Sequence, residues 1–323
     1  MTLRISEEDV RALLPMKVAL EAVEESFRSQ AAGEISLQPR QRIDFGERGL
    51  LHNMGAADRR SGYFGMKIYA SGRGAVRFLV LLYSSKTAEL LALIEAEALG
   101  QIRTGAATGV ATKFLAPAMA RTAAIIGTGY QARTQLQAIA KVRRLEMIWA
   151  YGRDPERRET FCSDMSAMLG VPVTPANSAE EAVSDAEIVV TVTNSAQPVL
   201  AGAWLRAGTH VNAVGANFAQ RRELDALAVE RATLIAVDSI AQAKIEAGDL
   251  IQAFAGDDGR WNGVVEMAEI VAGKRAGREQ PEQITFFKST GLASWDVAVA
   301  ARIYERAVAD GRGETIALWD EVE

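Results

Sequence analysis

An apolar segment that runs directly into a glycine-rich turn constrains the fold of this chain more than any other feature. Residues 122–126 read TAAII, and Gly127-Thr128-Gly129-Tyr130-Gln131-Ala132 follow at the start of a helical segment. The pattern G-x-G-x-x-G/A at a strand-to-helix junction is the fingerprint of a dinucleotide-binding turn. Gly127 would make the tight turn, and Gly129 would let a pyrophosphate approach the backbone. The N-terminus of the helix would bind the phosphates.

The chain after this turn alternates between short apolar segments and helical segments. Helices are expected from Tyr130 and over 156–169, and strands at 122–126, 147–151, 187–192, 209–214, 233–237 and 284–288. Strands that alternate with helices predict an α/β fold with a parallel, doubly wound sheet. This context favours dinucleotide binding over the alternative, a purely structural glycine turn. We therefore place a Rossmann domain at residues 119–295.

The first hundred residues follow a different pattern. Ser6 and the acids after it predict one helix start, and a second helix runs from Met16 to near Gly33. Short strand-like runs follow at 50–54, 63–70, 76–83 and 89–95, which predicts a mostly antiparallel sheet. A helix over 98–115 is rich in Ala, Gly and Thr and should pack closely against a neighbour, and a last helix over 294–309 should return to this region. Residues 1–118 and 296–323 are therefore expected to form an α+β domain.

Composition excludes several classes of function. Of the 323 residues, 49% are hydrophobic and 24% charged, and the net charge of −5 comes with no basic face for nucleic acid. One cysteine, Cys162, excludes an internal disulfide, and two histidines leave little for a metal centre. No segment resembles a signal peptide or is long enough to cross a bilayer. We expect a cytoplasmic enzyme without a metal that acts on a small molecule, with no nucleic-acid or membrane partner.

The end of the second Rossmann strand bears on the choice of dinucleotide. An acid at this point would hold the ribose 2′-hydroxyl of NAD. The sequence has Gly152 there, followed by Arg153, with Arg157 and Arg158 close behind. Guanidinium groups suit a 2′-phosphate, which favours NADP. NAD remains possible because Asp154 could still serve the ribose.

Four side chains of the first domain are candidates for chemistry because they lie near the ends of predicted strands or helices: Arg42, His52, Lys67 and Arg103. Lys67 lies in the mostly apolar segment GYFGMKIYA, where a buried ammonium is costly without a partner or a task. The alternative is a surface lysine at the end of a strand.

Four segments together resemble the ornithine cyclodeaminase/mu-crystallin family: LIEAEALGQIRTGAATGVATKFLA, IIGTGYQARTQ, HVNAVGANFAQRRELD and FFKSTGLASWDVAVAA. The resemblance extends from about residue 5 to residue 303, with the motifs in the family's order. It implies a homodimer whose N-terminal domain supplies the substrate pocket and the dimer interface. Members include ornithine and lysine cyclodeaminases, alanine dehydrogenases, ketimine reductases, and mu-crystallins that bind NADPH.

The resemblance also implies roles for the candidate side chains. Lys67 matches the catalytic lysine at the reacting C–N centre. Arg103 matches the arginine that grips the substrate carboxylate, a task that suits a bidentate guanidinium. Arg42 matches a second carboxylate-binding arginine, although a shift of two residues would substitute Arg40, which points the same way on a regular strand. His52 is expected among the substrate-binding residues.

On the cofactor side, the resemblance adds residues outside the glycine-rich turn. Ser289 and the backbone at Val214 and Gly215 resemble the lining of the nicotinamide, and Thr193 resembles a residue close to the dinucleotide. Together with Arg153, these are the expected cofactor-binding residues beyond the turn.

One departure from the family matters for the reaction. Cyclodeaminases carry an aspartate after the fifth Rossmann strand, where this chain has Asn217. An amide cannot act as a carboxylate base or balance an ornithine ammonium. Asn217 therefore favours imine reduction over cyclodeamination. Two alternatives stay open, namely that Asn217 is only a turn residue, or that Asp225 or Asp296 replaces the missing carboxylate.

These observations predict an NAD(P)H-dependent reductase of a small α-imino acid, with Lys67 donating a proton and Arg103 and Arg42 holding the carboxylate. Cyclic imines such as pyrroline- or piperideine-2-carboxylate are the leading candidate substrates. An acyclic or dicarboxylic imine such as iminosuccinate is also considered, because Arg40, His52 and Arg222 could add positive charge. The alternatives are an alanine-dehydrogenase-type amino-acid dehydrogenase, an ornithine cyclodeaminase, and a non-catalytic NADPH- and ligand-binding protein of mu-crystallin type.

Overall fold

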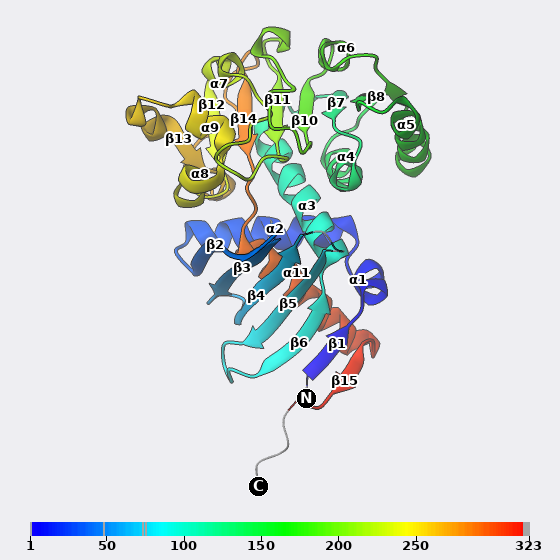
Figure 1. The fold of residues 1–323 in the computed structure, drawn as a ribbon, viewed down its shortest axis with the longest axis vertical. Coiled ribbons are helices and arrows are strands. Elements are labelled where there is room, and N and C mark those ends of the chain that lie inside the picture. Colours follow the sequence, from blue (N-terminus) through cyan, green and yellow to red (C-terminus); the bar gives the residue numbers. More distant parts are fainter. Residues whose placement is uncertain (1, 48, 73, 75, 319–323) are drawn as a thin grey trace. The chain divides into compact units, whose positions relative to one another are not determined.

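Two compact units make up this protein, of which the computed structural model describes residues 2–47, 49–72, 74 and 76–318. The first unit comprises Met1–Arg103 and Gly291–Glu323, and the second comprises Thr104–Thr290 (Figure 1). The boundaries inferred from the sequence, 118/119 and 295/296, lie further along the chain than both divisions in the structure. The reason at the first boundary is that helix α3 (Glu97–Leu115) contains the division, so no turn residue marks it.

A seven-stranded sheet forms the first unit, in the order β15-β1-β6-β5-β4-β3-β2. Strand β1 pairs in parallel with β6, and the other neighbours among the described strands are antiparallel, which confirms the predicted, mostly antiparallel sheet. The strands are β1 (Thr2–Ile5), β2 (Ile35–Gly46), β3 (Gly49–Asp58), β4 (Tyr63–Ser71), β5 (Arg77–Ser84), β6 (Leu90–Glu95) and β15 (Glu314–Ile316). The sequence patterns did not indicate β1, β2 or β15. Strand β2 is a polar edge strand that contains Pro39 and lacks apolar alternation, while β1 and β15 are too short for a periodic signal.

The first unit also contains the helices α1 (Glu7–Leu13), α2 (Met16–Ala31) and α11 (Ala293–Asp310), and the first turns of α3. Ser6 caps α1 through a reciprocal pair of hydrogen bonds with Asp9, as the acidic first turn predicted. Helix α11 packs on β3, β4 and α2, so the last helix does return to the first unit. Gly65 of β4 is required by the neighbouring strand β5, because a Cβ there would lie 2.3 Å from the Leu81 carbonyl oxygen.

An eight-stranded sheet forms the second unit, in the order β13-β12-β14-β11-β10-β7-β8-β9. All paired strands are parallel, which confirms the predicted doubly wound sheet. The strands are β7 (Thr122–Ile126), β8 (Met147–Tyr151), β9 (Val173–Pro175), β10 (Ile188–Thr191), β11 (His210–Ala213), β12 (Leu234–Val237), β13 (Val264–Glu266) and β14 (Thr285–Lys288). The helices are α4 (Tyr130–Val142), α5 (Pro155–Leu169), α6 (Ala179–Val183), α7 (Ala226–Arg231), α8 (Ile240–Glu246), α9 (Gly248–Ala253) and α10 (Met267–Val271).

Alternate residues of β7 enter two separate cores, one on each face of this sheet. Ile125 packs with Leu136 of α4, whereas Ile126 belongs to the core on the other face. The chain runs from β7 outward to β8 and β9, then returns to β10 on the other side of β7. The carboxyl ends of β7 and β10 therefore form the topological switch point, where open α/β sheets bind ligands.

Small residues of α3 explain the close packing that its composition predicted. A Cβ at Gly105 would lie 2.4 Å from the Thr134 carbonyl oxygen of α4, so the two helices touch along their backbones. Thr112 of the same helix accepts a hydrogen bond from the Asn212 amide at 3.1 Å. Within the described residues, no helix combines the length and the apolar composition that a membrane span requires.

Candidate active-site residues in the two units

The glycine-rich turn has the geometry that a dinucleotide phosphate requires. Gly127 adopts φ +110°, and a Cβ there would lie 2.5 Å from the Val192 carbonyl oxygen, so only glycine fits. Gly129 is the N-cap of α4, and no described atom lies within 4 Å of the position its Cβ would take. Ala132 is fully buried. The open space at Gly129, in front of the positive end of α4, therefore fits a pyrophosphate.

Residues after β10 and β11 lie next to this turn. The Val214 N–H donates to the Thr191 carbonyl at 2.9 Å, and a Cβ at Gly215 would lie 2.2 Å from the Thr193 carbonyl oxygen. A Cβ at Gly127 would in turn lie 3.1 Å from the Thr193 methyl carbon. The structure thus brings Thr193, Val214 and Gly215 to the switch point beside the glycine-rich turn.

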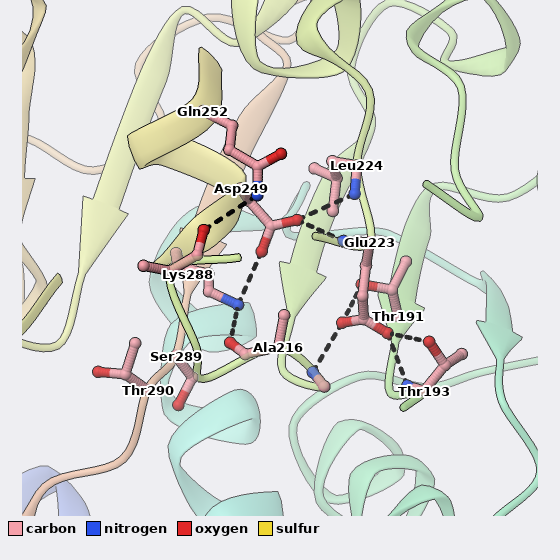
Figure 2. A network of polar contacts seen from close by, with 12 residues as sticks. Thr191, Thr193, Ala216, Glu223, Leu224, Asp249, Gln252, Lys288, Ser289 and Thr290 are labelled. Atoms are coloured by element: carbon pink, nitrogen blue, oxygen red, sulfur yellow. Dashed lines mark hydrogen bonds and ion pairs between the residues drawn. The ribbon is translucent and has the colours of Figure 1, made fainter. Parts of the chain in front are cut away.

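Ser289 and Asn217 lie in the segments that follow β14 and β11 of the same sheet. Ser289 directly follows β14 and is buried (Figure 2). Its hydroxyl lies 3.5 Å from a carboxylate oxygen of Asp238. Asn217 is half-buried and directly follows Ala216, whose carbonyl accepts a hydrogen bond from Lys288 at 2.6 Å. Asp225, considered as a replacement carboxylate, caps α7 and accepts from the N–H groups of Ala228 and Gly202 at 2.8 and 2.9 Å.

Packing at the end of β8 disfavours an acid at position 152. A Cβ at Gly152 would lie 2.4 Å from the Thr128 hydroxyl, so a longer side chain would displace Thr128. Asp154 caps α5 by accepting from the Arg157 N–H at 3.1 Å, and Arg153 is exposed. A pocket of about 360 Å³ lies here, lined by Thr128, Gly129, Tyr130, Arg133, Glu156, Arg157, Thr160 and Phe161.

In the first unit, Lys67, Asp296 and Arg103 form a buried ionic cluster. The Lys67 ammonium donates to both oxygens of Asp296, at 2.9 and 2.8 Å, and Arg103 Nε donates to Oδ1 at 2.9 Å. All three side chains are less than a tenth exposed. The Arg103 guanidinium also lies 5.9 Å from the ring centre of Trp295, and a Cβ at Gly291 would lie 2.8 Å from Arg103 Nη1. Strand β4, helix α3 and helix α11 therefore converge on one carboxylate.

Burial and neighbouring charges set the protonation of this cluster. Burial, followed by the charge of Arg103, lowers the pKa of Lys67 to about 7, although Asp296 opposes this shift. Burial alone would raise the pKa of Asp296, but Arg103 and Lys67 outweigh it, and the net effect lowers the pKa. Near neutral pH, Lys67 can therefore give up and regain a proton while Asp296 stays ionised.

Strand β2 carries the two arginines considered for the substrate carboxylate, Arg40 and Arg42. The pairing of β2 with β3 shifts between Gln38 and Gln41, which marks a bulge, but exposure still alternates over residues 39–43, with Arg40 and Arg42 on the less exposed side. Arg42 pairs across the sheet with His52 and is half-buried. Arg40 is 8% exposed, and its charge is among those that lower the pKa of Lys67. Arg40 is therefore close enough to Lys67 to affect its protonation.

His52 does not add positive charge, which corrects the expectation from the sequence. Burial, and then the charges of Arg42, Arg40 and Lys67, lowers the pKa of His52 to about 4, so its ring is neutral at pH 7. The ring stacks on Tyr69 with centroids 4.3 Å apart, and Nε2 lies 2.9 Å from the Ser71 hydroxyl. His52 can still serve as a neutral hydrogen-bonding group.

The sequence motifs did not reveal four buried charged residues: Asp296, which was considered only as a substitute base, Glu223, Asp249 and Lys288. Asp296 carried a usable signal. It shares the buried helical stripe of Ala300, Ile303 and Ala307, and a lone carboxylate on an apolar stripe needs a partner. Glu223, Asp249 and Lys288 lie in irregular segments or at element ends, where no periodicity marks a charged residue as buried.

Comparisons with known proteins identify the family of this chain. The model of the ornithine cyclodeaminase/mu-crystallin family matches residues 2–311. Delta(1)-pyrroline-2-carboxylate reductase from Bacillus cereus is 41% identical over 250 residues, covering 76% of this chain and 75% of the relative. The structure of the Thermococcus litoralis enzyme of that name, in complex with NADH and L-proline, is 35% identical with a TM-score of 0.93, covering 98% and 100% of the two chains.

An archaeal alanine dehydrogenase dimer with bound NAD is 35% identical with a TM-score of 0.92, covering 98% of this chain and 99% of that chain. The relatives are reductases and dehydrogenases of imino and amino acids, which confirms the predicted class, an NAD(P)-dependent oxidoreductase acting on C–N bonds. The chain belongs to the ornithine cyclodeaminase/mu-crystallin family, as its motifs predicted.

Proposed function

We propose that this protein is an NAD(P)H-dependent reductase of a small α-imino acid, with cyclic ketimines as the leading substrates. The buried cluster of Lys67, Asp296 and Arg103 is the observation that carries the proposal. It combines an amine whose pKa is about 7 with an arginine suited to a carboxylate. An imine nitrogen needs a proton as its carbon is reduced, and such an amine can supply it near neutral pH.

A dinucleotide bound at the glycine-rich turn would supply the hydride, and the residues of this chain would bind the substrate and supply the proton. Arg103, together with Arg42 or Arg40, binds the substrate carboxylate and orients the C=N bond. Lys67 Nζ donates a proton to the imine nitrogen, so that hydride at carbon and proton at nitrogen complete the C–N single bond. Asp296 holds Lys67 in place through both carboxylate oxygens. Burial of the cluster keeps water from competing for the proton.

Cyclodeamination of ornithine is disfavoured by the available carboxylates. Asn217 cannot accept a proton as a base, and Asp225 is engaged in capping α7. Asp296 contacts Lys67, but its lowered pKa makes it a weak base. Incubation with ornithine and catalytic NAD should yield no proline above background. Proline formed at an ordinary enzymatic rate would restore the cyclodeaminase alternative.

An amino-acid dehydrogenase is the second candidate, favoured by 35% identity to an alanine dehydrogenase over 98% of the chain. The same lysine and arginines could serve oxidative deamination. A protein that only binds NADPH and a ligand is disfavoured, because it would not need a buried lysine with a pKa near 7.

One assay separates these candidates. NAD(P)H oxidation is followed at 340 nm with pyrroline-2-carboxylate, piperideine-2-carboxylate, iminosuccinate formed in situ, and pyruvate with ammonia. Turnover of cyclic imines without turnover of pyruvate and ammonia supports the proposal. Turnover of pyruvate and ammonia alone would favour the dehydrogenase, and no turnover of any substrate would favour the binding protein.

For the dinucleotide itself, we propose a preference for NADPH, although the two structural relatives hold NADH or NAD. The support comes from this chain's own residues: an acid at position 152 would displace Thr128, and the exposed Arg153 follows Gly152. The pocket nearby is lined by two guanidinium groups, those of Arg133 and Arg157, although Glu156 lies there as well.

A homodimer through the first unit completes the proposal. Strand β2 is an edge strand of its sheet, and it exposes 56% of Ile43 and 61% of Phe45. Exposed apolar side chains on an otherwise polar edge strand offer a surface for pairing with a second copy. Light scattering should therefore report a dimer that Phe45→Glu weakens. A monomer at micromolar concentration would contradict it.

A further inference from the structure

We propose that Glu223 is a positioning residue for dinucleotide binding, because its buried carboxylate holds together the two loops that follow β10 and β11. The inference rests on the dinucleotide binding of the proposed function and is independent of which imine is reduced. Glu223 itself is fully buried. It therefore acts on a ligand only through the residues that it holds.

Four donors converge on the Glu223 carboxylate (Figure 2). Oε1 accepts from the backbone N–H of Thr193 at 2.6 Å and from its hydroxyl at 2.8 Å. Oε2 accepts from the Gly215 N–H at 2.7 Å and from the Thr191 hydroxyl at 3.0 Å. Hydrogen bonds from backbone N–H groups to a carboxylate are among the stronger ones in proteins. One side chain thus satisfies a backbone donor from each loop.

The residues that donate these hydrogen bonds lie at the end of the β10–β11 pairing or beyond it. The pairing of β10 with β11 ends at Thr191 and Ala213, so Thr193 and Gly215 lie beyond the ladder. A Cβ at Gly215 would lie 2.2 Å from the Thr193 carbonyl oxygen and 2.5 Å from Glu223 Oε1. Beyond the end of the β10–β11 pairing, the Glu223 carboxylate therefore keeps the two loops in contact. The loops meet at the switch point, where open α/β sheets bind dinucleotides.

A second buried carboxylate, that of Asp249, binds the backbone at Glu223. Asp249 Oδ1 accepts from the backbone N–H groups of Glu223 and Leu224, at 2.6 and 2.9 Å. Its Oδ2 lies 2.9 Å from the Lys288 ammonium, which donates to the Ala216 carbonyl at 2.6 Å. Burial raises the pKa of Glu223, and the nearby Lys288 opposes that shift. Continuous contacts thus lead from Thr191 to Ala216, next to Asn217 (Figure 2).

Glu223→Gln is the direct test. Whichever way the amide is turned, its NH₂ group must face a backbone N–H, of Thr193 or of Gly215, so one bond becomes a clash of donors. We expect the dissociation constant for NAD(P)H to rise about 10-fold or more, since a buried unsatisfied donor is this costly. The measurement is a fluorescence titration at a temperature where circular dichroism shows both proteins folded.

Glu187→Gln is the matched control. Glu187 Oε2 also accepts from backbone N–H groups, those of Arg121 and Thr122, and from the Thr122 hydroxyl, but at the amino end of β7. Its loss should lower the thermal midpoint and leave the dinucleotide dissociation constant unchanged. Because a merely structural role for Glu223 would give this same result, the dissociation constant separates positioning from stability.

Thr191→Val keeps the test informative if Glu223→Gln does not fold. Thr191 is fully buried, and valine has its shape without the hydroxyl that donates to Glu223. We expect a rise in the dissociation constant of about threefold, smaller than for Glu223→Gln, because the carboxylate loses one of its four donors and no donor is left unsatisfied. Binding by the unmodified protein that neither variant changes would overturn the inference alone. Absence of binding by the unmodified protein would overturn both the inference and the proposed function.

Discussion

Two buried ionic clusters in this chain have similar groups and different surroundings. In the first unit, Asp296 lies between two cationic side chains, Lys67 and Arg103. In the second, the carboxylates of Glu223 and Asp249 accept from backbone N–H groups at the ends of strands and in loops. A carboxylate bound to backbone fixes the path of the chain. A carboxylate bound to side chains fixes the position and the protonation of those side chains.

The comparison extends to the two lysines. Lys67 and Lys288 are both buried and both ion-paired, at 2.8 and 2.9 Å. The Lys67 cluster also includes Arg103, whose charge helps burial to lower the pKa of Lys67 to about 7. Lys288 instead donates to a backbone carbonyl, that of Ala216. We infer that Lys67 transfers a proton, and that Lys288 holds the loop that contains Ala216.

Replacing each lysine by methionine is the strongest test of the proposed difference between Lys67 and Lys288. Lys67→Met should lower kcat for imine reduction by about 10²-fold or more, the usual scale for losing a general acid. Its dinucleotide dissociation constant should stay within about twofold, because the glycine-rich turn belongs to the other unit. Lys288→Met should do the reverse, weakening dinucleotide binding while the bound enzyme keeps its pH dependence. Steady-state kinetics and binding titrations check both. If Lys67→Met turns over at the parent rate, Lys67 is a structural cation.

Arg103→Ala should have the next largest effect. A charged hydrogen bond to the substrate carboxylate is present before and during the reaction, so its loss should raise KM by about 10- to 10²-fold. Loss of orientation would also lower kcat. Arg40→Ala and Arg42→Ala, measured alongside, identify which arginine of β2 shares the carboxylate, since that variant alone should raise KM comparably. An unchanged KM in Arg103→Ala would remove Arg103 from the substrate site.

The pH dependence of reduction sharpens the comparison further. Because Lys67 must be protonated to donate, kcat/KM should fall as pH rises through about 7, approaching a tenfold loss per pH unit above it. Asp296→Asn removes the contact that favours the ammonium form, so the fall should move to lower pH. Asp249→Asn, which removes the carboxylate beside Lys288, should leave the midpoint in place. A midpoint that Asp296→Asn does not move would exclude Lys67 as the titrating group.

The smallest effect is expected at the adenosine end of the second unit. NADPH should bind more tightly than NADH, and Arg153→Ala should remove most of a difference of about threefold to tenfold, the range for an exposed charge pair. Arg144→Ala is the control, because Arg144 is also exposed but precedes β8, whereas Arg153 follows it. Equal affinities in the unmodified protein would contradict the proposed preference.

Local patterns in the sequence predicted six of the eight strands of the second unit, and they missed β9 and β13, which have three residues each. Strand β7, the turn at Gly127 and the start of α4 at Tyr130 were all placed correctly, because strand periodicity, glycine conformation and helix entry depend on adjacent residues. The same logic failed for β2, whose polar edge position removes the alternation. It also failed for the bulge near Arg40, which local sequence does not announce.

By itself, the sequence determined the family, the doubly wound sheet and the identity of Lys67 and Arg103 as candidates, since each depends on contiguous motifs. Only the tertiary structure decided which groups these side chains meet. Lys67 and Asp296 are 229 positions apart, and they touch because α11 packs against β4 in the folded chain. Glu223 likewise reaches Thr193 and Gly215 only after β10 and β11 have paired. A pKa near 7 at Lys67 arises from burial and from charges brought together by folding, and no local pattern encodes either.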